Sequence, residues 1–176
     1  MKVTFIRHTS VAVESGICYG QSDVNVANSF KSEAEIIRQK LDTKQFDAIY
    51  CSPMSRCTKL AGYCGYETPI IDNRLMELNF GDWEMKFWHE INDSQLECWY
   101  ADWINEKPTN GESFVEQVQR VENFLNELKT TGHKQVLIFT HAGVIRSVGI
   151  ATNQFSLTEA FEYKVEYGYI LELRID

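Results

Sequence analysis

Three short apolar segments of this chain each run into a turn that carries an arginine or a histidine, and a helical pattern follows each turn. They are residues 2–6 with Arg7 and His8, residues 47–51 with Arg56, and residues 135–139 with His141. Strands that alternate with helices in this way build an open, mostly parallel sheet. In such a sheet the turns that follow the strands gather in one crevice outside their carboxyl ends. The pattern therefore predicts that two arginines and two histidines meet at one edge of the sheet.

Other periodic segments favour a three-layer α/β/α sandwich with a mostly parallel central sheet. The clearest helix begins at Ser113, which forms a capping-box pattern with Glu116, and apolar residues follow at helical spacing as far as Leu128. Apolar residues also share one face of a helix that begins near residue 30. A chain of 176 residues is long enough for one sizeable core, so we expect a single domain over residues 1–176.

Weaker signals predict the remaining elements. A short strand is expected at residues 69–71, and residues 163–175 alternate and bend at Gly168 like one or two edge strands. The tryptophan-rich residues 87–105 are interpreted as helical.

Two helix starts are predicted from serine residues. Ser32 with Glu35 fits a capping box in the helix near residue 30. Ser52 followed by Pro53 fits an N-cap and the first helical position of the next helix, which places Arg56 in its first turn.

The charge balance argues against several classes of partner. The chain has 17 lysines and arginines against 25 aspartates and glutamates, a formal net charge of -8. Broad attraction to nucleic acid or anionic lipid is therefore not expected, and an anionic substrate needs a local positive pocket. No apolar run approaches the roughly 18 residues of a membrane span, and the first segment is too short for a secretory core. We expect a cytoplasmic protein without nucleic-acid or membrane partners, and its oligomeric state stays open.

The five cysteines form no C-x-x-C pair, so the sequence suggests neither a disulfide framework nor a zinc ribbon. Cys57, Leu60, Ala61 and Cys64 fall on one helix face, which predicts that both cysteines are small apolar core residues. Cys18 belongs to no such pattern.

The predicted crevice holds residue types that suit cleavage of a phosphate ester. That reaction needs a nucleophile, positive charge around the phosphoryl oxygens, and a proton for the departing oxygen. A neutral imidazole at His8 suits the first need, and the guanidinium of Arg7 matches phosphate oxygens in geometry. His141, if protonated, adds charge, and the helix that begins just after it presents free amide hydrogens to the same anion. Glu77 can supply the proton if apolar neighbours raise the pKa of its carboxyl.

A simpler interpretation stays open for each of these residues. A single histidine or arginine at a strand end is more often a hydrogen-bonded surface residue than a catalyst, and Glu77 alone would more often be a surface charge. Their recurrence at three equivalent junctions is what favours a phosphate site.

Five segments resemble the successive signatures of the histidine phosphatase superfamily, the phosphoglycerate mutase-like group. In chain order they are Ile6-Arg-His-Thr, Cys51-Ser-Pro-Met-Ser-Arg-Cys, Leu75-Met-Glu-Leu-Asn-Phe-Gly-Asp-Trp-Glu, Asn110-Gly-Glu-Ser and Phe139-Thr-His-Ala-Gly-Val-Ile-Arg. The resemblance implies that His8 becomes a phosphohistidine and that Glu77 donates the proton and later activates water. It also implies a phosphate pocket formed by Arg7, Arg56 and His141, with no metal and no cofactor.

The chain departs from the family pattern directly after the arginine–histidine pair. The family usually has a glycine there and an asparagine further on, whereas this chain continues with Thr9 and Ser10. A hydroxyl of Thr9 or Ser10 can still bond a phosphate oxygen. The usual His-Gly-Gly is His141-Ala142-Gly143 here, a small change that is compatible with the same helix start.

Among the family members, a hydrolase is favoured. Isomerases of the family commonly carry extra segments over the site, for which 176 residues leave little room. Residues 16–26 are similar to the Cys-Tyr-Gly-x-x-Asp-Val stretch of α-ribazole phosphatases, which implies that Tyr19 and Gly20 border the substrate with Cys18 beside them. The implied substrate is a small phosphate ester, α-ribazole 5′-phosphate in cobalamin nucleotide-loop assembly. Nearby aromatic residues are candidates to stack on its flat base, namely Trp83, Phe87, Trp88, Trp99 and Trp103.

Several alternatives remain open. A phosphoglycerate mutase or a broad sugar-phosphate phosphatase would use the same residues, and a phospho-ligand binding module would use the pocket without turnover. Residues 16–26 could equally pack under the edge of the sheet. A nucleotide-binding α/β domain is disfavoured, because it needs a glycine-rich first turn and residues 7–10 contain no glycine.

Overall fold

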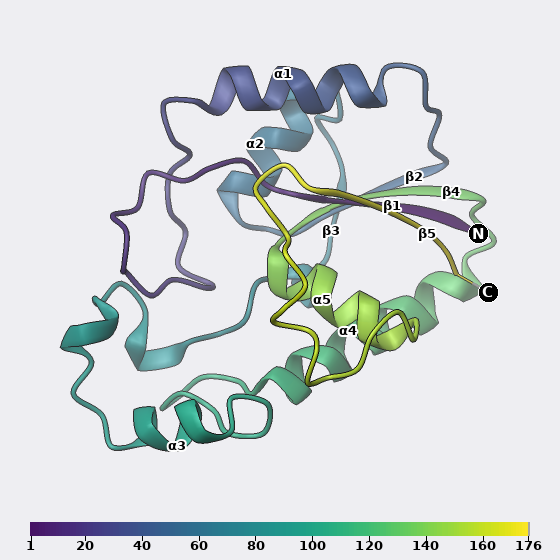
Figure 1. Ribbon diagram of the computed structural model, residues 1–176. Coiled ribbons are helices and arrows are strands. Elements are labelled where there is room, and N and C mark those ends of the chain that lie inside the picture. Colours follow the sequence, from purple (N-terminus) through teal and green to yellow (C-terminus); the bar gives the residue numbers. More distant parts are fainter. Residues whose placement is uncertain (176) are drawn as a thin grey trace.

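The computed structural model describes residues 1–175, and at its centre lies a five-stranded sheet with the order β3-β2-β4-β1-β5. The strands are β1 (Lys2–Arg7), β2 (Ala48–Cys51), β3 (Ile70–Ile71), β4 (Gln135–Thr140) and β5 (Ile170–Arg174). The first four pair in parallel, and β5 runs antiparallel beside β1. The predicted mostly parallel sheet is therefore confirmed. The carboxyl ends of β1, β2 and β4 lie at the edge that faces away from the two chain termini (Figure 1).

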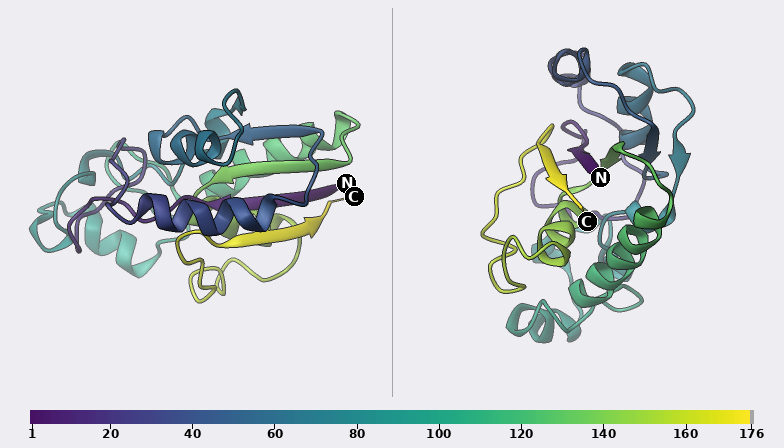
Figure 2. Two further views of the ribbon diagram at one scale, coloured as in Figure 1. Left: turned by 90° about the horizontal axis from the view of Figure 1, so that it is seen from above. Right: turned by 90° about the vertical axis from the view of Figure 1, so that its right-hand side faces the viewer.

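Helices cover both faces of this sheet, as the predicted three-layer sandwich requires (Figures 1 and 2). One layer contains α1 (Phe30–Leu41) and α2 (Ser55–Tyr63), and the other contains α4 (Phe114–Thr130) and α5 (Ala142–Ala151). No helix within residues 1–175 is both long enough and apolar enough to span a lipid bilayer.

Alternating side chains of the central strand β4 supply both cores. Val136 and Ile138 pack with the apolar faces of α4 and α5, whereas Leu137 and Phe139 pack with those of α1 and α2. Successive residues of a strand point to opposite faces, so a continuous apolar run is what a strand buried on both sides needs. β1 pairs with the full length of this strand, and β2 pairs with Val136 to Phe139 on its other side.

The weaker edge elements also form as predicted. β3 has only two residues, and the side chains of Ile70 and Ile71 are about half exposed, 50% and 49%. β5 is a single edge strand that follows a turn at Gly168, where φ is +69°. The predicted buried face of α2 is confirmed for Cys57, which is fully buried with its apolar neighbours on that face.

Of the three capping patterns predicted at serine residues, one is confirmed and two are wrong. The Ser113–Glu116 capping box is present at the start of α4. Helix α1 begins at Phe30, and the Ser32 hydroxyl donates to the carbonyl of Ser29 instead of forming a capping box. Helix α2 begins at Ser55 rather than Pro53. The side chain of Ser52, which was expected to cap α2, is directed instead to His141.

Residues 76–113 form a lobe beyond the carboxyl edge of the sheet (Figure 1). Its elements are two 3-10 turns, Gly81–Trp83 and Trp88–Glu90, and the short helix α3 (Gln95–Ala101), whereas the preceding 3-10 turn Asn73–Leu75 packs with α4 in the main core. The prediction of one helix over residues 87–105 is therefore wrong in its extent.

Asp93 explains why the helix in this lobe starts late. Its carboxylate accepts hydrogen bonds from the indole nitrogen of Trp83 at 2.8 Å and from the amide of Gln95 at 3.0 Å. The second bond fixes the start of α3 at Gln95. Before α3 the chain is not α-helical, and there Trp88 packs in an aromatic cluster with Trp83 and Trp99.

The loop between β1 and α1 packs closely against this lobe at Gly20. A β-carbon at position 20 would lie 1.9 Å from the carbonyl oxygen of Leu78 and 2.9 Å from the ring of Phe80. Only glycine lets the two segments approach this closely. In contrast, a β-carbon at Gly62 on helix α2 would meet nothing within 4 Å.

These two glycines give a matched test of the loop contact. Gly20→Ala should lower the free energy of unfolding by about 1–3 kcal/mol, because the backbone of the lobe must move to relieve the overlap. Gly62→Ala should leave stability unchanged or raise it by up to about 1 kcal/mol, since alanine favours the helix. Urea unfolding of both variants measures this difference, and equal stability of the two would contradict the packing described here.

Candidate active site

His8 follows directly after β1 at the carboxyl edge of the sheet, and only 2% of its surface is exposed. Its Nδ1 lies 2.8 Å from the carbonyl oxygen of Thr9. A carbonyl can only accept, so Nδ1 carries the proton and Nε2 keeps a free lone pair. Burial lowers the pKa of His8 well below its usual value, and the nearby His141 and Arg56 lower it further. The ring is therefore a neutral imidazole, the form in which it can act as a nucleophile.

His141 stands at the N-cap of α5 and faces His8, with 5.1 Å between the two ring centroids. Its Nε2 lies 2.8 Å from the Ser52 hydroxyl, which can donate to it. Burial lowers the pKa of His141 well below its usual value, with contributions from Arg56 and Arg7. The protonated His141 considered from the sequence is thus not the resting form. A neutral ring that accepts at Nε2 presents a proton at Nδ1.

The two predicted arginines are brought to the same place. Arg56 is fully buried, and its Nη1 and Nη2 donate to the carbonyls of Ser22 at 2.9 Å and Gly20 at 2.5 Å. Arg7 donates from Nη1 to the carbonyl of Val165 at 2.5 Å. Within residues 1–175 neither guanidinium has a carboxylate oxygen within 4.0 Å. Their positive charge is therefore not neutralised by an ion pair.

Four buried polar atoms of the predicted site residues lack a hydrogen-bond partner among the described residues. They are Arg7 Nε, Arg56 Nε, Thr9 Oγ1 and His141 Nδ1. Buried polar groups are nearly always satisfied, so such a group of donors needs an explanation. An anion with several acceptor oxygens matches them, because three of the four atoms can only donate in the forms described above and the fourth is a hydroxyl.

Glu77 is partly buried at this site, and its carboxyl is held differently from what the sequence suggested. Its oxygens accept from the amides of Leu78 at 2.9 Å and Gly143 at 3.1 Å, and from the side chain of Gln117 at 3.3 Å. Burial alone would raise the pKa of Glu77, yet these hydrogen bonds and the charge of Arg7 outweigh it and lower the pKa. The expectation of a raised pKa is therefore wrong, and the carboxyl of Glu77 is ionised.

The start of α5 accounts for much of the lowered pKa of Glu77. The amide of Gly143 lies in the first turn of the helix, where amide hydrogens have no partner within the helix and the helix dipole favours negative charge. A β-carbon at Gly143 would lie 2.2 Å from Glu77 Oε1, so only glycine lets the carboxylate reach this amide. The helix end that was expected to face the phosphate thus contacts Glu77.

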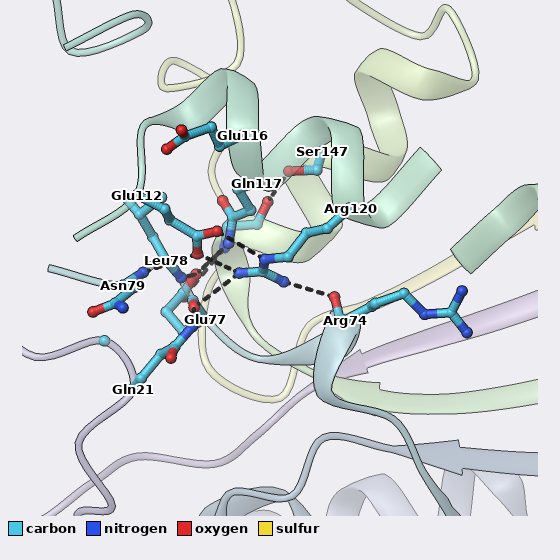
Figure 3. A network of polar contacts seen from close by, with 12 residues as sticks. Gln21, Arg74, Glu77, Leu78, Asn79, Glu112, Glu116, Gln117, Arg120 and Ser147 are labelled. Carbon is cyan, nitrogen blue, oxygen red and sulfur yellow. Dashed lines mark hydrogen bonds and ion pairs between the residues drawn. The ribbon is translucent and has the colours of Figure 1, made fainter. Parts of the chain in front are cut away.

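A second layer of polar contacts fixes the backbone of Glu77, and sequence reasoning missed all of its members (Figure 3). The carbonyl of Glu77 accepts from Gln21 at 3.1 Å and from Arg120 at 3.0 Å. Arg120 is in turn paired with Glu112, at 2.6 Å between Nη2 and Oε1. Figure 3 shows Arg120 reaching across from α4 between Glu112 and the 74–77 segment.

Gln117, which donates to the Glu77 carboxylate, is a further missed residue, and the sequence could have revealed it. It lies on α4 on the same face as Phe114, Val118 and Val121, and it is fully buried. A polar residue inside an apolar helical stripe signals a buried polar contact. Arg120 and Glu112 gave no such signal, because charged residues near a helix start are usually exposed.

A cavity of about 250 Å³ opens in front of His8 and Glu77. Tyr19 and Cys18 line it, as the resemblance implied, and burial raises the pKa of the Cys18 thiol to about 12, which keeps it protonated. Of the aromatic residues proposed to stack on a substrate, Trp88 lines the cavity, whereas Trp83 is fully buried in the core of the lobe. Other aromatic rings, among them Phe80, Phe114 and Phe161, complete the wall.

The other predicted binding residues lie outside the lining of this cavity. Thr9 is fully buried next to His8, and the amide of Ser10 donates to Glu33 at 2.8 Å. Gly20 contacts Leu78 and offers its carbonyl to Arg56. Arg146 on α5, which the sequence analysis did not assign, does line the cavity.

The sequence model of the histidine phosphatase superfamily (branch 1) matches residues 3–176. The chain belongs to this superfamily. The resemblance seen in the five motifs is thereby confirmed. The family and the phosphatases among its relatives together show a phosphatase, a hydrolase.

Individual relatives share most of the chain. It is 27% identical over 176 residues to the adenosylcobalamin/alpha-ribazole phosphatase of Salmonella typhimurium, across 96% of this chain and 87% of that protein. It is 24% identical to phosphoserine phosphatase 1 of Hydrogenobacter thermophilus, across 93% and 81%. The crystal structure of the alpha-ribazole phosphatase from Shigella flexneri is similar with a TM-score of 0.91 at 26% identity, across 100% of this chain and 91% of that one. These matches support the phosphoglycerate mutase-like fold.

The two buried histidines predict how stability depends on pH. Each has a pKa in the folded protein below its usual value of 6.5, so the unfolded chain binds more protons just below that pH. The free energy of unfolding should therefore be highest above about pH 6.5 and fall as the pH is lowered, by up to about 1.4 kcal/mol per pH unit for each histidine. Urea unfolding between pH 5.5 and 7.5 measures the slope. His141→Asn should flatten it, and a slope unaffected by this change would contradict the neutral assignment.

Proposed function

We propose that the protein is a metal-independent phosphomonoesterase that acts through a phosphohistidine at His8. Nε2 of His8 attacks the phosphorus atom, the P–O bond to the leaving group breaks, and the departing oxygen takes a proton from Glu77. Water then attacks the phosphorus of the phosphohistidine and gives a proton to Glu77, the bond between phosphorus and Nε2 of His8 breaks, and inorganic phosphate is released. The observation that carries this proposal is the group of four unpartnered polar atoms around a neutral imidazole.

Phosphate binding would supply what those atoms need. The phosphoryl oxygens accept from the Nε–H groups of Arg7 and Arg56 and from the Nδ1–H of His141. The two positive guanidinium groups neutralise the charge of a phosphate dianion. Such preorganised donors stabilise the transferring phosphoryl group without having to reorganise. The hydroxyl of Thr9 is the proposed fourth donor.

Glu77 takes both proton-transfer roles because its protonation responds to the ligand. Its hydrogen bonds and the charge of Arg7 keep it ionised. A phosphate ester in the adjacent cavity adds negative charge next to the carboxylate, which raises the pKa of Glu77 and favours the protonated acid. Once the alcohol has left, the carboxylate is again a base near the phosphohistidine and can activate water.

The proposed substrate is α-ribazole 5′-phosphate in the assembly of the cobalamin nucleotide loop. The names of the Salmonella and Shigella relatives support this choice. So does the cavity, because the ring of Tyr19 and the aromatic wall around Trp88 offer apolar surface to a flat base beside the phosphoryl site. The sequence similarity of residues 16–26 points the same way.

A second candidate is a phosphatase for small esters that carry a carboxylate, such as phosphoserine or 3-phosphoglycerate. Arg146 favours it, because this arginine lines the cavity without a carboxylate within 4.0 Å among the described residues. An arginine there could bind a second anionic group of the substrate. The relative named phosphoserine phosphatase 1 supports the same candidate.

Phosphate release in EDTA tests the proposed function and separates the candidates. The wild-type protein should release phosphate from α-ribazole 5′-phosphate faster than from phosphoserine, 3-phosphoglycerate or p-nitrophenyl phosphate. His8→Ala should lose nearly all turnover and the acid-labile phosphoenzyme, because the attacking nitrogen is removed. A preference for the carboxylated esters would favour the second candidate. Activity retained by His8→Ala, or lost in EDTA, would overturn the mechanism.

Glu77→Gln tests the proton donor. Glutamine keeps the size of the side chain but cannot donate the proton, so esters of alcohols should lose activity by about 100-fold or more. Aryl esters such as p-nitrophenyl phosphate should lose far less in the first step, because their leaving group departs without a proton. Burst kinetics measures that step separately from hydrolysis of the phosphohistidine. Equal losses on both kinds of ester in the burst phase would remove Glu77 from the role of acid.

A further inference from the structure

Tyr167 lies against both members of the Arg7–His8 pair, although no sequence pattern singles it out. Its ring centroid lies 4.0 Å from the guanidinium carbon of Arg7 and 5.6 Å from the centroid of the His8 ring. The carbonyl of Val165, two residues earlier, accepts the hydrogen bond from Arg7 Nη1 at 2.5 Å. One short stretch of the loop between α5 and β5 therefore holds the guanidinium through a ring and through a carbonyl.

The backbone around Tyr167 is fixed to the same pair of residues. The amide of Gly168 donates to the carbonyl of His8 at 3.1 Å, and the amide of Arg7 donates to the carbonyl of Tyr169 at 2.9 Å. Gly168 has a φ of +69°, a conformation that favours glycine and turns the chain into β5. The ring of Tyr167 is thus placed by backbone contacts and does not depend on a free loop tip.

A hydrogen bond between two hydroxyls holds the other end of the ring. Tyr167 Oη lies 2.8 Å from Oη of Tyr19, a residue 148 positions away in the sequence. Tyr19 lines the cavity, and its own ring centroid lies 5.7 Å from the guanidinium carbon of Arg56. Burial and this hydrogen bond raise the pKa of Tyr19, so its hydroxyl keeps its proton. The pair joins the β1–α1 loop to the α5–β5 loop beside His8.

Arg7 needs such support because it has no ion-pair partner. Its Nε is buried without a hydrogen-bond partner, and no carboxylate within residues 1–175 lies within 4.0 Å of its guanidinium nitrogens. A long arginine side chain has much rotamer freedom to lose when it binds an anion. A carboxylate would fix it but would also compete with the phosphate. An aromatic ring fixes the cation and leaves its charge available.

We propose that Tyr167 is a positioning residue for phosphate binding. Its ring holds the Arg7 guanidinium where it meets the phosphoryl group, and its hydroxyl, bonded to Tyr19, fixes the ring. The inference rests on the proposed function, because it takes Arg7 as a ligand of the phosphate. Tyr167 acts through Arg7 and is assigned no contact with the reacting atoms.

Inhibition by inorganic phosphate and by orthovanadate tests this role in the full-length protein. Tyr167→Leu should raise the inhibition constant for phosphate and the KM for p-nitrophenyl phosphate by about tenfold. The inhibition constant for vanadate should rise by a larger factor, since a transition-state analogue depends more on preorganised donors. Tyr167→Phe keeps the ring and should restore both constants to within about threefold of wild type. Tyr63→Leu is the matched control, because Tyr63 lies on α2 with its hydroxyl near Glu35.

A double-mutant cycle separates positioning from a general structural effect. If the ring acts through Arg7, Tyr167→Leu should change phosphate inhibition by less than about twofold in an Arg7→Ala background. Thermal melts of all variants establish that they are folded. Should Tyr167→Leu fail to fold, Tyr167→Met, which keeps a long apolar side chain without a ring, takes its place in the same cycle.

Three results would each overturn the inference. They are a Tyr167→Leu variant that binds phosphate as wild type does, a Tyr167→Phe variant that is as weak as Tyr167→Leu, and full additivity with Arg7→Ala. Failure of the proposed function looks different, since the wild-type protein itself would then hydrolyse no phosphate ester, and both proposals would fall. Wild-type binding with an unchanged constant in Tyr167→Leu overturns the Tyr167 role alone.

Discussion

Two guanidinium groups without a carboxylate partner, one fully and one partly buried, are the constraint on which the rest of this structure depends. The fully buried Arg56 reaches the carbonyls of Gly20 and Ser22, and Arg7 reaches the carbonyl of Val165. Burying an unpaired cation is unfavourable, and carbonyl oxygens offset only part of that cost. An acidic partner would stabilise the fold, but it would also occupy the charge that a phosphoryl group needs. The loops after β1 and before β5 therefore hold the two guanidinium groups through backbone carbonyls and leave their charge available to a phosphoryl group.

The same edge of the sheet holds groups in opposite protonation states at short range. His8 and His141 are kept neutral by burial and by the neighbouring cations. Glu77 is kept ionised by the first turn of α5 and by Gln117, although burial opposes its charge as well. Hydrogen bonding thus decides the state of the carboxyl, whereas desolvation decides that of the imidazoles. This separation gives one site a neutral nucleophile and a base without any need for a change of pH.

The sequence predicted the sheet and the meeting of the site residues because both follow from repeated, local patterns. Each strand end beside Arg7, Arg56 or His141 carried its own turn and helix signal. Parallel pairing of the strands then brings these ends to the same edge of the sheet. Predictions were wrong where a side chain forms its hydrogen bonds with residues distant in the sequence instead of with its local neighbours. Ser52 turns to His141 instead of capping α2, and the hydrogen bonds to Glu77 come from α4 and α5, which no local pattern places beside it. Positions at which a local rule fails often mark functional sites, as Ser52 does here.

The unpartnered donors around His8 also link the stability of the fold to its surroundings. Any anion that fills them binds the folded chain and not the unfolded one, so it stabilises by mass action. At a concentration about 100 times its dissociation constant, such an anion would add about 2.7 kcal/mol to the free energy of unfolding. A melting temperature recorded in phosphate buffer would then be that of the protein–phosphate complex, and it would lie above that of the protein alone.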